Sequence, residues 1–136
     1  MELPNTNERV AINTSEKVNN DIQMYIQNSI YFYRRNPQLI EQRLEELDKE
    51  WDIERVLETN ASSLIVASSA LGFVASKKFF FIPFLVGSFL LQHALQGWCP
   101  PLPILRRLGY RTTSEIQEER EALQNIVKGL RHVARN

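Results

Sequence analysis

The sequence predicts an all-α protein in which a two-helix transmembrane hairpin is flanked by amphipathic helices. Charged side chains are cleared from residues 59–105, where only Lys77 and Lys78 remain, although 24% of the whole chain is charged. The two lysines divide this apolar block into halves that are each about as long as a membrane-spanning helix. Outside the block, apolar residues recur every three or four positions, which is the spacing of an amphipathic helix.

Composition divides the chain into three segments, residues 1–52, 53–98 and 99–136. We expect a polar arm with amphipathic helices, then the hairpin, then a proline-rich turn with a C-terminal amphipathic helix. Residues 1–60 carry 12 acidic and 7 basic side chains and residues 61–136 carry 4 and 9, so the formal net charge of zero conceals two halves of opposite sign. A neutral chain lacks the basic surplus of a nucleic-acid-binding protein, and we expect no nucleic-acid partner.

The first segment predicts a loose arm over residues 1–13 that can include a short helical piece, followed by two helices. Thr14 or Ser15 can cap the first helix, which ends where Asn36 precedes Pro37, because a residue before proline avoids the helical region. The second helix begins near Pro37. Its apolar positions lie four, three and four residues apart and predict a seam that packs on a neighbouring helix. These positions are Ile40, Leu44, Leu47 and Trp51.

The second segment predicts the hairpin. Asp52 is placed to cap a helix that begins at Ile53 and runs into the apolar block. At a rise of 1.5 Å per residue, the halves 59–76 and 79–98 measure about 27 and 30 Å, close to the roughly 30 Å of a bilayer's hydrocarbon core. Small residues recur every four positions on the first half and face a glycine of the second, which predicts close helix packing. These residues are Ser68, Gly72, Ser76 and Gly87.

A soluble helical bundle is the alternative to the membrane hairpin. In that arrangement the amphipathic helices would wrap around the two apolar ones, which need cover on all sides. Three amphipathic helices in a chain of 136 residues offer little cover. The aromatic run from Phe79 to Phe84 would also favour aggregation if water reached it. The membrane interpretation is therefore favoured.

The third segment opens with Pro100, Pro101 and Pro103, which end the second apolar helix. A short helix closed by Gly109 follows, and Thr112 with Glu115 has the spacing of a capping box for the last helix.

The basic residues of this segment predict both a contact and an orientation. We expect Arg106, Arg107 and Arg111 to contact lipid headgroups. Because basic residues near the outer ends of the hairpin outnumber the two lysines of its turn, we expect both termini in the cytoplasm. The N-terminus lacks the basic and apolar regions of a signal peptide, so internal apolar segments would direct insertion.

His93 and Cys99 are the candidates for a functional role. An intramembrane histidine can relay a proton or bind a ligand, and the alternative is an ordinary polar contact with a neighbouring helix. Cys99 follows Trp98 at the expected bilayer edge, within reach of water, but a helix C-terminus disfavours its thiolate. One histidine and one cysteine do not complete a metal site. We expect no catalytic, cofactor-binding or metal-binding residues.

Residues 60–119 carry a recognisable pattern: two short apolar helices, Trp98-Cys99-Pro100, further prolines, and a Leu-Arg-Arg-Leu-Gly-Tyr-Arg-Thr stretch that contains Gly109. This pattern resembles a small bacterial inner-membrane domain of uncharacterised function that is elsewhere fused to rhodanese (sulfurtransferase) domains. The resemblance implies a two-helix membrane hairpin, location in the bacterial inner membrane, and association, often as dimers. The first 50 residues of this chain look helical and do not resemble a rhodanese domain.

These observations lead to an expected function and two alternatives. We expect a non-enzymatic integral membrane protein that acts as an oligomerising or accessory interaction module, either as a homo-oligomer or as a subunit of a larger membrane complex. One alternative is a transport or sulfur-relay component that uses Cys99. The other is a soluble helical-bundle protein.

Overall fold

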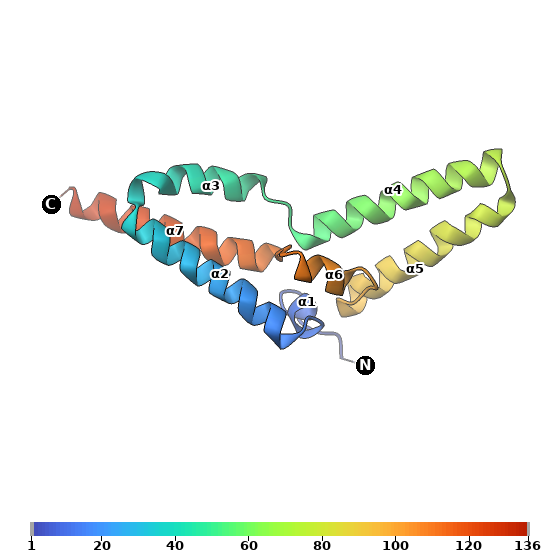
Figure 1. The fold of residues 1–136 in the computed structure, drawn as a ribbon, viewed down its shortest axis with the longest axis horizontal. Coiled ribbons are helices and arrows are strands. Elements are labelled where there is room, and N and C mark those ends of the chain that lie inside the picture. The colour runs from blue at the N-terminus through green and yellow to red at the C-terminus, as the bar shows by residue number, and fades with distance from the viewer. Residues whose placement is uncertain (1, 136) are drawn as a thin grey trace.

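The computed structural model describes residues 2–135, which form helices and turns without a β-strand, so the all-α prediction is confirmed for this part of the chain. The molecule is elongated, with the α4–α5 turn at one end and the C-terminus of α7 at the other (Figure 1). In chain order the elements are α1 (Arg9–Ile12), α2 (Glu16–Arg35), the 3-10 helix η1 (Pro37–Leu39), α3 (Ile40–Lys49), α4 (Ile53–Val74), the 3-10 helix η2 (Lys77–Phe80), α5 (Phe81–Gln96), α6 (Leu102–Arg107) and α7 (Thr113–Val133).

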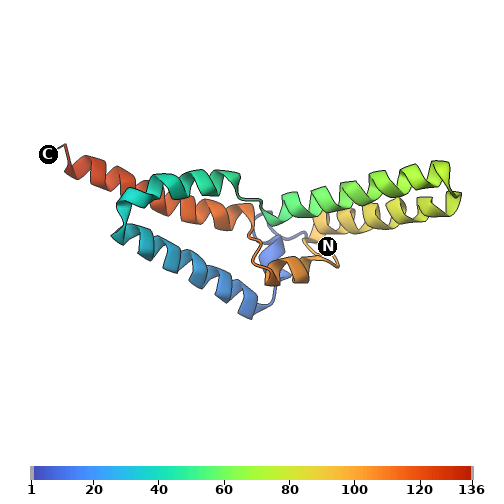
Figure 2. The same cartoon turned by 45° about the horizontal axis from the view of Figure 1, so that its top comes forward.

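Helices α2, α3 and α7 form the part of the molecule that we call the head. Helix α7 lies between α2 and α3 and packs on both (Figures 1 and 2). Ile40 and Leu47 of α3 are buried against Ile116 and Leu123 of α7. Each of these pairs is seven residues apart, so one stripe of each helix supplies the core, as the spacing predicted. Segments 1–52 and 99–136 therefore contribute to one head.

Helices α4 and α5 form the part that we call the hairpin. They run side by side in opposite directions, and η2 closes the turn between them (Figures 1 and 2). Pro83 lies in the first turn of α5, where its missing N–H interrupts no helical hydrogen bond. Gly97 ends α5 in the left-handed conformation, with φ of 77°, a region that glycine enters without the cost of a Cβ.

Helices α1 and α6 fill the junction between head and hairpin. Val10 of α1 is buried there with Ile53, Leu57, Cys99 and Leu102. The short helical piece expected within residues 1–13 is present as α1. This part of the arm is not loose, because burial of Val10 fixes the helix against the start of α4. The sequence shows the short apolar run Val10-Ala11-Ile12, and only the fold reveals that Val10 is buried while Ile12 is 65% exposed.

Sequence capping signals define where the long helices begin. Asp52 Oδ1 accepts a hydrogen bond of 2.7 Å from the backbone N–H of Arg55, and Thr112 forms a capping box with Glu115, so both predicted caps are confirmed. The prediction for Trp51 is wrong. Helix α3 ends at Lys49, and Trp51 is 43% exposed beneath the guanidinium of Arg55, at 4.6 Å from its ring centroid.

Candidate functional site

The hairpin presents a large apolar surface. Within residues 2–135, Lys77–Gln96 is the one helical segment that is long and apolar enough to cross a membrane, judged by length and composition. Only 6% of its apolar window is buried inside the molecule, so it is not the core helix of this fold. Helix α4 does not meet the same test, because Glu54, Arg55 and Glu58 charge its first turns and serines dilute the rest. The side chains most exposed on the hairpin are Val66, Phe73, Val74, Phe81, Phe84 and Leu91.

Four serines of the hairpin, Ser62, Ser63, Ser68 and Ser88, donate their hydroxyl groups to carbonyls of their own helices. Ser63 Oγ donates to the carbonyl of Thr59 at 2.7 Å, Ser68 Oγ to that of Leu64 at 2.5 Å, and Ser88 Oγ to that of Phe84 at 2.8 Å. A hydroxyl that is already paired costs less to transfer out of water than a free one. These serines therefore lower the hydropathy of the hairpin without leaving free donors.

The predicted small-residue face is used unevenly. Ser68 and Gly72 are buried between the helices, and a Cβ added at Gly72 would lie 2.9 Å from the ring of Phe80. Ser76 instead caps η2, where its Oγ accepts from the backbone N–H of Lys78 at 3.4 Å. A Cβ at Gly87 would meet nothing within 4 Å. Close approach within the hairpin thus depends on Gly72, and Gly87 takes no part in it.

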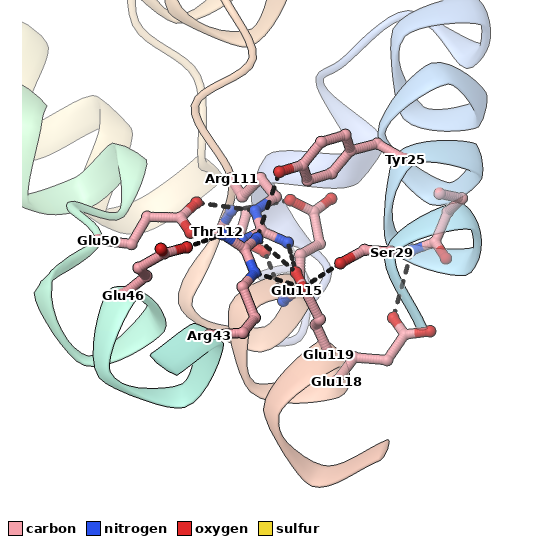
Figure 3. A network of polar contacts seen from close by, with 11 residues as sticks. Tyr25, Ser29, Arg43, Glu46, Glu50, Arg111, Thr112, Glu115, Glu118 and Glu119 are labelled. Atoms are coloured by element: carbon pink, nitrogen blue, oxygen red, sulfur yellow. Dashed lines mark hydrogen bonds and ion pairs between the residues drawn. The ribbon is translucent and has the colours of Figure 1, made fainter. Parts of the chain in front are cut away.

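A buried ionic network holds the head together (Figure 3). Glu119 of α7 is fully buried, and its carboxylate accepts from Arg43 of α3 at 2.9 Å, from Arg111 at 2.6 Å and from Ser29 Oγ of α2 at 2.5 Å. Arg111 also donates to both carboxylate oxygens of Glu50, at 2.8 and 2.5 Å. The carboxylate of Glu119 therefore joins α2, α3 and α7 at one point.

The network sets the charge state of its members. Burial alone would raise the pKa of Glu119, but hydrogen bonds from Arg43, Ser29 and Arg111 outweigh it and hold the pKa below its ordinary value. Burial would lower the pKa of Arg111, but its hydrogen bonds to the carboxylates of Glu50 and Glu119 raise the pKa above its ordinary value. Both groups are therefore ionised at neutral pH, and each compensates the buried charge of the other.

A second buried ion pair lies next to α6. Both carboxylate oxygens of Glu115 accept from Arg106, at 2.7 and 2.8 Å, and Arg106 also donates to Asn19 Oδ1 at 3.0 Å. Burial would raise the pKa of Glu115, but the hydrogen bonds from Arg106 and from the backbone N–H of Thr112 lower it. This pair ties α6 to the start of α7 and to α2.

These ion pairs correct the prediction for the lipid-facing arginines. Arg106 and Arg111 are 1% and 2% exposed and are bound to carboxylates of the head, so neither reaches a headgroup. Arg107 alone of the three is exposed. The physical reason is that Glu115 lies nine residues after Arg106, and Glu119 eight residues after Arg111, on α7. The turn at Gly109 folds α6 back toward them.

His93 and Cys99 lie together at the base of the hairpin. Both line a cavity of about 330 Å³ between α4, α5 and the Pro100-Pro101 turn. Cys99 is only 4% exposed, so the prediction that water reaches it at the bilayer edge is wrong. Burial raises the pKa of its thiol, although the backbone N–H of Leu102 partly offsets this effect. The thiol is therefore protonated and shielded, as expected of a structural cysteine.

Few sequence signals indicate that Glu115 and Glu119 are buried and bound to arginines. Glu115 and Glu119 lie four apart on one face of a charged helix, which is also the pattern of a solvated face. Arg106 lies nine positions before its partner Glu115, and Arg111 lies eight positions before its partner Glu119. The sequence does not predict how the turn between them is oriented. One signal that could have indicated their burial is the apolar stripe of α7, because Ile116 and Leu123 lie close to the two glutamates along the helix.

Comparisons with known proteins add no relative. No protein-family model matches the chain, no curated protein matches it, and no solved structure matches it. The functional argument therefore rests on the geometry described above.

Proposed function

We propose that the chain is an integral membrane protein whose α4–α5 hairpin crosses the bilayer and whose head is a non-enzymatic interaction module at one membrane face. The observation that carries this proposal is the exposure of the apolar segment Lys77–Gln96, where only 6% of the apolar window is buried inside the molecule. Soluble monomers rarely expose apolar patches of this kind, whereas a lipid bilayer covers them without a protein partner.

The packing of α4 on α5 supports two spans. Helix α4 runs antiparallel to α5 along the length of the hairpin, so a bilayer that contains α5 also contains the apolar part of α4 (Figure 1). The hydrogen bonds of Ser63 and Ser68 to their own helix lower the cost of placing them there. Twenty residues from Lys77 to Gln96 extend about 30 Å as a helix, which matches the hydrocarbon thickness.

The two ends of the hairpin have the features of membrane surfaces. Lys77 and Lys78 are exposed at the tip, where their ammonium groups would meet water on the far side. At the base, α6 exposes Ile104, Arg107 and Leu108. A helix that exposes apolar and basic side chains together suits the interfacial layer of a membrane.

The head has exposed apolar side chains that suit an interaction module. Tyr31 and Phe32 near the end of α2 are 57% and 49% exposed, and Leu130 and Val133 near the end of α7 are 48% and 78% exposed. Both sets lie at the end of the head away from the hairpin (Figure 1). A second copy of the chain or another membrane subunit would cover them. We place the head in the cytoplasm of a bacterium, in line with the charge distribution and with the resemblance to an inner-membrane domain.

The alternatives have weaker support. A sulfur relay requires a reactive thiolate, but Cys99 is buried and the pKa of its thiol is raised. A soluble bundle requires a cover for the hairpin, and the head lies beyond the base of α4 and α5 instead of around them (Figure 2).

Membrane extraction tests the proposal. The full chain should stay in the pellet after alkaline carbonate and high-salt washes and should dissolve in detergent. Phe84→Lys places a charge on the exposed surface of α5 and should reduce membrane recovery, because one lysine in mid-span costs about 2.5–3.5 kcal/mol on insertion scales. The matched Phe32→Lys change on the head should leave recovery unchanged. Release of the unmodified protein by carbonate would refute the membrane hairpin.

A further inference from the structure

The cavity at the base of the hairpin combines an apolar lining with a buried, unpaired imidazole. His93 is 5% exposed, and both of its ring nitrogens are buried without a hydrogen-bond partner among residues 2–135. An imidazole offers a donor at one nitrogen and an acceptor at the other. Leaving such a group unpaired in an apolar environment is unfavourable, so a bound molecule that pairs with the imidazole would stabilise the site.

The cavity has the size and lining of a ligand pocket. Its volume of about 330 Å³ lies at the lower end of the roughly 300–1,000 Å³ that is typical of small-molecule sites. His93 and Asn60 lie at the level of the proline turn, while Leu64 and Val86 line the cavity one to two helical turns closer to the hairpin tip. The pocket is therefore polar at its base and apolar toward the membrane.

Bound water alone suits this site poorly, because most of the lining is apolar. A buried water molecule is stable when it makes about three hydrogen bonds to polar groups. The side-chain amide of Asn60 uses one N–H on the carbonyl of Val56 at 2.8 Å, and its second N–H and its oxygen can pair with a molecule at the polar base. Cys99, the remaining polar side chain in the lining, is a weak donor. A molecule that presents one oxygen to His93 and fills the rest of the cavity with apolar groups suits the lining better.

We propose that this cavity binds a lipid-soluble molecule with an uncharged oxygen group at its head, either a carbonyl or a hydroxyl, which forms a hydrogen bond with His93. The apolar body lies between α4 and α5, along Leu64, Val86 and Phe89. Isoprenoid quinones and isoprenoid alcohols both have this chemistry. The proposal goes beyond the membrane anchor and depends on it only for the source of the ligand.

The chain offers an unusually clear spectroscopic test, because it contains two histidines. The full chain is labelled with ¹⁵N-histidine and placed in phosphatidylcholine nanodiscs, so that His93 reports the cavity and His132, on α7 in the head, serves as the internal control. Three probes are titrated: decylubiquinone with carbonyl groups, farnesol with a hydroxyl group, and decylbenzene with no oxygen. We expect decylubiquinone or farnesol to shift the His93 ring resonances saturably and to leave His132 unchanged, and the active probe identifies the head group.

Two variants of α4 test whether the cavity itself is the site. Ala61 lines the cavity, so Ala61→Phe should fill it and weaken binding by about tenfold or more, equivalent to about 1.4 kcal/mol. Ala67 is exposed on the same helix outside this cavity, and Ala67→Phe should bind the probe like the unmodified chain. Unchanged His132 resonances confirm that the head of each variant is folded.

Three results would overturn the proposal. They are the absence of a saturable His93 shift with both oxygen-containing probes, an equal shift with decylbenzene, and equal weakening by Ala61→Phe and Ala67→Phe. The titration of the unmodified chain decides the question even if Ala61→Phe fails to fold. Because carbonate extraction tests the anchor separately, failure of the pocket and failure of the anchor are distinguishable.

Discussion

Glu119 and Arg111 form an ion pair of 2.6 Å in which one side chain is 0% exposed and the other 2%. Arg111 lies just before α7 and Glu119 two turns inside it, so the pair closes the helix start onto its own body. Since Glu119 also binds Arg43 of α3 and Ser29 of α2, the pair is the centre of the head (Figure 3).

Removal of the charge of Glu119 should destabilise the head strongly. In Glu119→Gln, Arg43 and Arg111 lose a buried counter-charge, and breaking such a pair typically costs about 3–5 kcal/mol. Urea denaturation of the full chain in detergent micelles, followed by circular dichroism, measures the loss. Glu118→Gln changes an exposed neighbour whose carboxylate accepts from Gln23 at 3.3 Å, and it should alter stability by less than about 0.5 kcal/mol. Equal effects of the two changes would contradict a central role for Glu119.

The head should lose stability in acid. Glu115 and Glu119 have lowered pKa values in the folded chain, whereas an unfolded glutamate titrates near about 4.3. Their stabilisation is therefore complete above that pH and is lost as the pH falls through the folded pKa values, because the unfolded chain then binds more protons. The free energy of unfolding, measured by urea titration from pH 7 down to pH 3, should fall most steeply below about 4.3. Glu119→Gln should show a shallower fall, and a flat profile in the unmodified chain would refute this account.

Gly97 should be required for the docking of α1. Gly97 and Gly109 both have positive φ, 77° and 91°, but a Cβ at Gly97 would lie 2.3 Å from the carbonyl oxygen of Arg9, whereas one at Gly109 would meet nothing within 4 Å. Both alanine changes add a left-handed backbone cost of about 1–2 kcal/mol. Only Gly97→Ala adds a clash that displaces α1. Limited proteolysis should cut residues 2–15 of Gly97→Ala faster than those of Gly109→Ala, and equal rates would contradict the docking.

Cys99 should react slowly in the folded chain. Its side chain is 4% exposed, and burial raises the pKa of the thiol, so both access and thiolate fraction are low. As the single cysteine, it is counted directly by maleimide labelling. We expect labelling in micelles to be at least about tenfold slower than after denaturation in dodecyl sulfate. Comparable rates would show that the junction core opens readily.

Local rules predicted most of the helices, because each rule involves residues that are close in the sequence. Asp52 begins α4 and Thr112 with Glu115 begins α7 where the capping signals are placed. Asn36 before Pro37 ends α2. The predicted seam of α3 is correct at Ile40 and Leu47 and wrong at Trp51, because the helix ends at Lys49, two residues before Trp51.

The features that local rules did not predict depend on contacts between residues that are distant in the sequence. The docking of α1 depends on Arg9, which donates to the carbonyl of Ala94 at 3.0 Å and to Glu54 at 2.6 Å. Two of the three arginines expected at lipid headgroups, Arg106 and Arg111, are instead bound by Glu115 and Glu119, and neither partnership has a sequence signature. The cavity that joins His93 to Cys99 depends likewise on how the Pro100-Pro101 turn folds back over α4.

Topology mapping of the hairpin tip tests the central claim most directly. In a Cys99→Ser background, Lys78→Cys places a single thiol at the tip and Asn125→Cys places one on the exposed face of α7. Each full-length variant is expressed in bacterial cells and treated with a membrane-impermeant maleimide before and after permeabilisation. A hairpin that crosses the membrane with a cytoplasmic head predicts that Lys78→Cys reacts in intact cells and that Asn125→Cys reacts only after permeabilisation. Reaction of both thiols from the same side would contradict the membrane-spanning hairpin.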